Sequence, residues 1–111
     1  MTDIDTMEAG AEMDAMVQKL VMGWKLHNIQ WHPSSFIADA WEVVEKMRAM
    51  GWHAVLRGDS DLWTAIFDDG RRPLEAVANS APLAVCRAAL SIEDRNTNTA
   101  APAGVDGERI G

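Results

Sequence analysis

Apolar residues recur at helical spacing in three parts of the chain. In the first part they follow the i, i+3, i+4 pattern of an amphipathic helix: Met13, Met16, Val17, Leu20 and Val21. Acidic residues cluster in the first turn, where the helix dipole favours them, and Gly23 offers the left-handed conformation that ends many helices. The pattern therefore predicts a helix over about residues 9–22.

The strongest helical pattern follows Pro33. Its apolar positions are Ile37, Ala40, Trp41, Val44 and Met47, widened by Phe36, Val43 and Met50. Ser34 or Ser35 is suited to cap the N-terminus of this helix, and Gly51 is suited to end it. We expect the helix to bury Trp41, and the width of its apolar face is compatible with a symmetric homo-oligomer.

After the second helix the period changes to two. Residues 52–57 and 62–67 alternate between apolar and polar side chains, and the turn-forming residues 58–61 separate them. A second turn at residues 68–70 leads to a third extended segment at residues 74–77. Alternation broken by short turns is typical of antiparallel hairpins, so we predict a three-stranded meander.

The third helical segment is followed by a polar tail. Ser80 is placed to cap a helix that tolerates Pro82 in its first turn and continues to about Leu90 or Ser91. Residues 92–111 offer little apolar surface to bury, and this composition predicts a disordered tail.

Two further segments lack a regular pattern. Residues 1–8 are predicted to form a flexible acidic start, and residues 24–31 a short strand or an extended arm. A chain of 111 residues is long enough for one compact core. We therefore predict a single domain over residues 9–91, of the α+β class, with helices packed on a small antiparallel β-sheet in an α/β/α sandwich-like arrangement.

Three segments resemble the small phage and prophage proteins of the phage ABA sandwich domain family: VMGW at residues 21–24, AWEVVEKM at 40–47 and APLAVCRAAL at 81–90. The resemblance extends over about residues 9–91. It implies helices on a small antiparallel sheet and an origin in a phage or prophage. It implies no set of catalytic residues.

The formal net charge of −7 is concentrated at the two ends of the chain, because residues 15–91 contain eight acids and eight bases. A neutral domain lacks the broad basic face that binds extended nucleic acid. No apolar run approaches the roughly 18 residues that span a bilayer, so we expect no membrane contact. Cys86, the single cysteine, lies in an apolar helical segment, which predicts a core position and a reducing compartment. We expect the protein in the cytoplasm of the host cell.

Tryptophans and arginines are the candidates for a binding surface. Trp52 and Trp63 lie in the alternating strands and are expected to be structural. Trp24 and Trp31 flank the irregular arm, where an exposed indole would stack on a base or anchor a partner. Arginines stand at the predicted hairpin ends and, with Lys25, would form an anion site if the fold brings them together; otherwise they are separate turn charges. The candidate ligand-binding residues are Trp24, Trp31, Arg57, Arg71 and Arg72.

An enzyme is the less favoured class. The spacing of His27, His32 and His53 matches no zinc motif, so we expect neither a metal site nor a cofactor. Cys86 lies in apolar company that disfavours a thiolate, and no nucleophile elbow or glycine-rich phosphate loop occurs. We expect no catalytic residues.

Two hypotheses of function follow. The first is a non-enzymatic phage or prophage accessory protein that sequesters a nucleotide-type immune signal and so counters host defence. The alternative is a protein–protein interaction module that inhibits a host protein or assists phage assembly, through a patch around Trp24, Ile29 and Trp31. A hydrolase of a small phosphorylated compound is a weaker third hypothesis, because it lacks a recognisable metal site or nucleophile.

Overall fold

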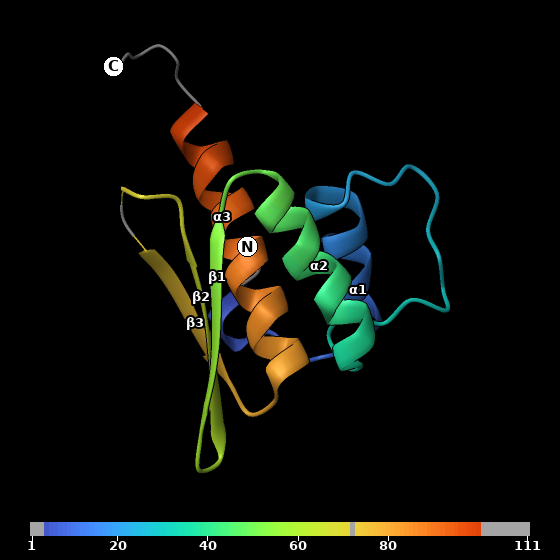
Figure 1. Cartoon of the computed structure of the whole chain (residues 1–111). Helices are drawn as coiled ribbons and strands as arrows, with labels where there is room; N and C mark the ends of the chain where they lie inside the picture. Colours follow the sequence, from blue (N-terminus) through green and yellow to red (C-terminus); the bar gives the residue numbers. More distant parts are fainter. Residues whose placement is uncertain (1–3, 72, 101–111) are drawn as a thin grey trace.

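The computed structural model describes residues 4–71 and 73–100, and for residue 5 and residues 94–100 it describes the backbone alone. Its elements in chain order are the 3₁₀ turn η1 (Ile4–Thr6), helix α1 (Ala11–Met16), the π-helical turn η2 (Val17–Val21), helix α2 (Ile37–Ala49), strands β1 (His53–Asp59), β2 (Leu62–Asp68) and β3 (Pro73–Ala78), and helix α3 (Ala81–Ala100). This architecture confirms the predicted α+β class, with helices packed on a small antiparallel sheet (Figure 1).

The sheet is the predicted meander, in the order β1-β2-β3 with antiparallel neighbours. The β1–β2 ladder runs without interruption from the His53–Asp68 pair to the Asp59–Leu62 pair. Ser60 occupies the turn with a φ of 52°, in the left-handed region that suits such a tight hairpin. The turn chemistry at residues 58–61 therefore fixed both the position of the hairpin and its register.

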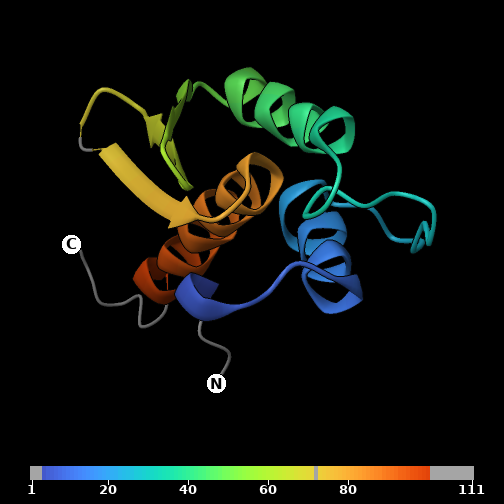
Figure 2. The same cartoon turned by 90° about the horizontal axis from the view of Figure 1, so that it is seen from below.

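One face of the sheet lines the core. Alternate residues of β2 and β3 are buried there: Ala65, Phe67, Leu74, Ala76 and Ala78. Helix α3 packs on this face and on α2 and η2, so it lies between the sheet and the N-terminal helical segment (Figures 1 and 2). Its small side chains, Ala84, Ala88 and Ala89, let it pack closely on both sides. Cys86 is fully buried in this helix, as predicted.

Helix α2 buries only part of the apolar face predicted for it. Its buried positions are Ala40, Val43, Val44 and Met47, whereas Trp41 is 50% exposed and Ile37 is half-exposed. The helix packs its four buried positions against α3 and β1, which leaves Trp41 at the side of the contact. The prediction of a buried Trp41 is wrong, because periodicity gives the width of an apolar stripe but not the line along which a neighbour packs.

The cap of α2 also differs from the prediction. Phe36 is the N-cap residue and makes no side-chain capping bond, because the Ser34 hydroxyl is used elsewhere and Ser35 is exposed. Asp39 in the first turn instead accepts a hydrogen bond of 2.8 Å from the His32 backbone N–H. The other predicted helix signals hold: Gly23 and Gly51 have positive φ, and Ser80 accepts the Leu83 N–H with its hydroxyl oxygen.

Helix α3 and the N-terminal segment both extend beyond the elements predicted for them. Helix α3 continues through Ala100, and Ile92 is buried because it extends the stripe of Ala88 and Ala89 by one turn. The tail predicted over residues 92–111 stays a prediction, and residues 101–111 lie outside the described part. At the other end, Ile4 and Met7 pack against the core.

Candidate functional site

Residues 24–31, here called the arm, form an irregular loop rather than a strand (Figure 1). The side chain of Gln18, which is only 2% exposed, makes the backbone hydrogen bonds that a neighbouring strand would otherwise make. Its Nε2 donates to the Asn28 carbonyl at 2.9 Å and its Oε1 accepts the Asn28 N–H at 2.7 Å. The Trp24 N–H donates to the Gln18 carbonyl at 2.9 Å. The buried amide thus satisfies the backbone N–H and carbonyl of Asn28 and fastens the arm to the N-terminal helical segment.

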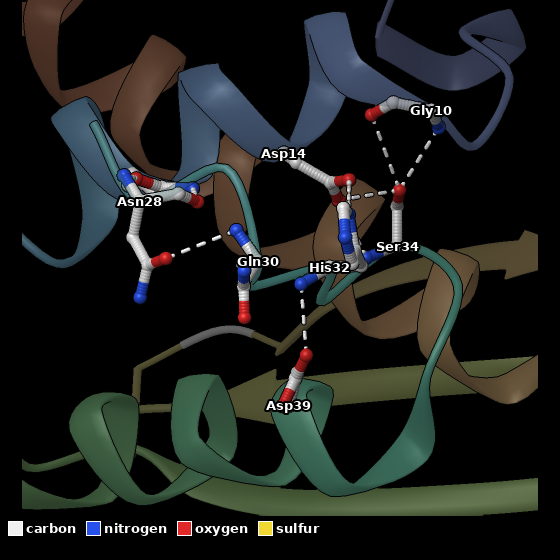
Figure 3. A network of polar contacts seen from close by, with 8 residues as sticks. Gly10, Asp14, Asn28, Gln30, His32, Ser34 and Asp39 are labelled. Atoms are coloured by element: carbon white, nitrogen blue, oxygen red, sulfur yellow. Dashed lines mark hydrogen bonds and ion pairs between the residues drawn. The ribbon is translucent and has the colours of Figure 1, made fainter.

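A second polar cluster fixes the end of the arm, and Figure 3 shows it between α1 and α2. Asp14 is buried, and its Oδ1 accepts both the Ser34 hydroxyl at 2.6 Å and the Ser34 N–H at 2.9 Å. The Ser34 Oγ in turn accepts the Gly10 N–H at 3.0 Å. His32 Nδ1 lies 3.3 Å from Asp14 Oδ2. The carboxylate therefore ties the chain before α2 to the start of α1, and its hydrogen bonds offset the cost of its burial.

This cluster contains serine, histidine and aspartate, but it is not arranged for nucleophilic catalysis. The Ser34 hydroxyl bonds to Asp14 rather than to His32, and Ser34 is fully buried. A nucleophile needs a base to take its proton and access to a substrate carbonyl. The geometry makes this cluster a positioning device for the arm.

The arm presents apolar side chains to solvent. Leu26 is 87% exposed and Ile29 is 74% exposed. At the base of the arm, the rings of Trp24 and Trp31 are 4.6 Å apart between centroids. Trp31 is only 5% exposed, and its Nε1–H donates to Glu42 of α2 at 3.2 Å. The exposed surface predicted for Trp31 is therefore wrong, and Leu26 and Ile29 occupy the outward positions instead.

A groove of about 580 Å³ lies between the N-terminal helical segment and the arm. Its lining residues are Ala15, Gln18, Lys19, Gly23, Trp24, Lys25, Leu26 and His27. The lining combines one indole with two ammonium groups and contains no acidic residue. This combination suits an aromatic or apolar group that carries negative charge.

A comparison with family models matches residues 5–90 to the phage ABA sandwich domain. The chain belongs to the phage ABA sandwich domain family. No match was found among curated proteins or among solved structures. The family gives this ABA sandwich domain a phage origin, and the site must be argued from its own residues.

The predicted basic cluster does not assemble within one ABA sandwich domain. Arg57 pairs with Thr64 toward the β1–β2 turn, whereas Arg71 follows the far end of β2, where Asp68 pairs with His53. Arg57 and Arg71 are exposed and belong to opposite ends of the hairpin ladder. Arg72 lies outside the described residues. Neither Arg57 nor Arg71 lines the groove beside Trp24, where Lys19 and Lys25 are the basic residues.

Sequence reasoning missed Lys19, Gln18 and Asp14. Lys19 lies near the end of the first predicted helix, where a basic residue is a common surface feature and gives no sign of a binding site. Gln18 and Asp14 stand among apolar residues at 13, 17 and 21, and this polar interruption of a core stripe was the available signal.

Within the described ranges, no group of three or more His, Cys, Asp and Glu residues is arranged to hold a metal ion. No helix among the described residues is both long and apolar enough to cross a membrane. Trp52 packs against the core as predicted, while Trp63 is half-exposed and its ring lies over Gly58 of β1.

Cys86 is expected to be inert in the folded ABA sandwich domain. Burial raises the pKa of its thiol well above the ordinary value, and the nearby Asp14 carboxylate raises it further. Because the thiolate is the reactive form and the site opens only on unfolding, labelling with a thiol reagent should be about a thousandfold slower than in denaturant. Rapid labelling in native buffer would show that α3 opens locally.

Proposed function

We propose that this chain is a non-enzymatic phage or prophage accessory protein that binds a protein partner in the host cell through the arm. The observation that carries the proposal is the exposure of Leu26 and Ile29 on a loop held by hydrogen bonds to the buried Gln18. Large apolar side chains held in water are unfavourable unless a partner covers them.

The rigidity of the arm supports this interpretation. A flexible loop would lose conformational entropy on binding, whereas Gln18 already holds Asn28 within this loop and Asp14 holds Ser34 just after it. The Trp24–Trp31 pair beneath the arm gives a firm base, which is a common property of binding hot spots. The partner is then a host or phage protein with an apolar pocket large enough for the two aliphatic side chains.

The test is capture of a partner from phage-infected host cells by the tagged protein, with identification by mass spectrometry. The Leu26→Ser/Ile29→Ser variant should lose the partner at least about tenfold while unfolding at the same temperature, because both side chains are already solvated. Leu62→Ser is the matched control, since Leu62 is also half-exposed but lies at the β1–β2 turn. Equal capture by all three proteins would refute the arm as the binding surface.

A second candidate function is sequestration of a nucleotide-type immune signal, and the groove beside the arm favours it. There, the Trp24 indole would stack on a base, and Lys19 and Lys25 would bind phosphate oxygens. This version retains the anti-defence role but replaces the predicted arginines by lysines. It requires no partner protein.

The two functions are separated by matched variants. If the groove binds nucleotides, Lys19→Ala/Lys25→Ala should weaken retention of cyclic and linear dinucleotides in native mass spectrometry, while Lys46→Ala of α2 should not. The same lysine variant should leave protein capture by Leu26 and Ile29 intact. If no nucleotide is retained by the wild-type protein, the second candidate is rejected and the first is unaffected.

A further inference from the structure

Strand β1 has a hydrogen-bonding edge that no described strand pairs with. The sheet order β1-β2-β3 places β1 at one side of the sheet, and its seven residues run without a bulge from His53 to Asp59. The strand contains no proline, and its charged residues, Arg57 and Asp59, would protect the edge against a strand of like charge but not against one that pairs opposite charges with them. A long, regular edge of this kind is a template for another strand.

The opposite edge of the sheet is protected. Strand β3 begins with Pro73, which offers no N–H to a neighbour. The Arg87 side chain donates through Nη1 to the Val77 carbonyl at 2.9 Å. Its Nε and Nη2 donate to the Met7 carbonyl at 3.1 and 2.9 Å, which fastens the N-terminal segment beside β3. The fold thus closes one edge and leaves the other open.

The open edge is flanked by apolar side chains. Trp41 of α2 and Val55 of β1 are each half-exposed. Trp41 and Val55 line a small crevice with Ala54 and Leu56, and Figure 1 shows the C-terminal end of α2 close to the start of β1. This exposed flank is the part of α2 that the sequence pattern predicted to be buried. A strand added at β1 would cover it.

We propose that β1 pairs antiparallel with β1 of a second copy across a two-fold axis, so that two chains share a six-stranded sheet. With the axis at Leu56, all seven residues of β1 are paired. His53 then lies opposite Asp59 of the partner subunit, and Val55 opposite Arg57 of the partner subunit. Each end of the ribbon therefore joins an imidazole with a carboxylate.

The neighbouring registers are less favourable. With the axis at Arg57, that residue faces its own copy, and with the axis at Val55, Arg57 faces His53 of the partner subunit. Both arrangements place bases directly opposite each other, and both leave part of β1 unpaired. Charge and strand length therefore select the register centred on Leu56.

This register also explains the exposed indole. The residues of β1 that project toward the helices are Ala54, Leu56 and Gly58, of which two are small. In the dimer the Trp41 ring of each copy covers this face of the partner's strand. The arm lies on the far side of the helices from the sheet (Figure 1), so the dimer presents two separate arms and leaves both free to bind.

The register is tested by a single cysteine on the axis. Antiparallel partners lie about 4.5–5.5 Å apart between Cα atoms, within the range that a disulfide spans. Leu56→Cys should therefore form a covalent dimer on mild oxidation, whereas the native Cys86 is buried and does not compete. Ile66→Cys, on the opposite face of the central strand, is the control and should remain monomeric. Cross-linking of Ile66→Cys but not of Leu56→Cys would overturn the proposal in favour of face-to-face stacking.

The pairing of His53 with Asp59 of the partner subunit is tested without an engineered cross-link. The wild-type protein should be a dimer by light scattering at tens of micromolar. His53→Asp should raise the dissociation constant of this dimer about five- to tenfold, because two pairs of carboxylates then face each other. Adding Asp59→Lys should restore the dimer, while His27→Asp on the arm should have no effect. A monomeric wild-type protein, or no recovery in a double variant that is folded by circular dichroism, would refute the edge pairing.

Discussion

Replacing Trp31 with alanine is expected to lower the free energy of unfolding by about 3–5 kcal/mol, the usual cost of removing a large buried aromatic side chain. Trp31 is 5% exposed, packs against the Trp24 ring and donates its indole N–H to Glu42. Its loss leaves a cavity under the arm and removes a link between the arm and α2. Urea denaturation followed by circular dichroism measures the change.

Trp41→Ala is the matched control for Trp31→Ala. The same atoms are deleted from a side chain that is 50% exposed, so the expected loss is about 1 kcal/mol or less. The comparison should be made at a dilution that dissociates the proposed dimer, since Trp41 belongs to its interface. Equal losses for the two variants would contradict the burial pattern of the structure and favour the pattern predicted from helical periodicity.

Replacing Asp14 with alanine is expected to lower the free energy of unfolding by about 3 kcal/mol, since each buried donor left unpaired costs about 1–3 kcal/mol. Asp14 is the acceptor for both the hydroxyl and the N–H of Ser34. The arm should also become mobile at its second anchor, so backbone amides of residues 28–34 should exchange faster with deuterium.

Ser34→Ala separates the hydrogen bonds of this cluster from the charge. That variant removes one hydroxyl but keeps the Ser34 N–H on the carboxylate, so its expected cost is about 1 kcal/mol. A larger loss for Ser34→Ala than for Asp14→Ala would show that the buried carboxylate destabilises the fold and that serine compensates for it.

The candidate site was predictable in location but not in composition. The failure of periodicity at residues 24–31 correctly indicated an irregular segment beside a tryptophan. Which side chains point outward depended on Gln18, a residue ten positions away from its partner Asn28. Leu26 and Ile29 were therefore exposed and Trp31 buried, contrary to the ranking of tryptophans as the exposed anchors.

The predicted arginine cluster is a second case in which the sequence indicated the elements but the prediction of which side chains meet was wrong. A meander was predicted correctly, but its strand lengths place Arg57 and Arg71 toward opposite turns. The meander topology itself implies this separation, because successive turns of a meander lie at opposite ends of the sheet. The observed β1–β2 register shows the separation of Arg57 from Arg71 directly.

By itself, the sequence determined the elements that depend on neighbours in the chain. Turn residues at 58–61 and 68–70 set the two hairpins, Gly23 and Gly51 ended helical segments, Ser80 began α3, and the apolar setting of Cys86 placed it in the core. The tertiary structure alone decided which flank of α2 stays exposed, why α3 extends past Ser91, and how Asp14 and Gln18 hold the arm. The reason is that turns and caps act over a few bonds, whereas burial and side-chain hydrogen bonds depend on partners that only packing brings together.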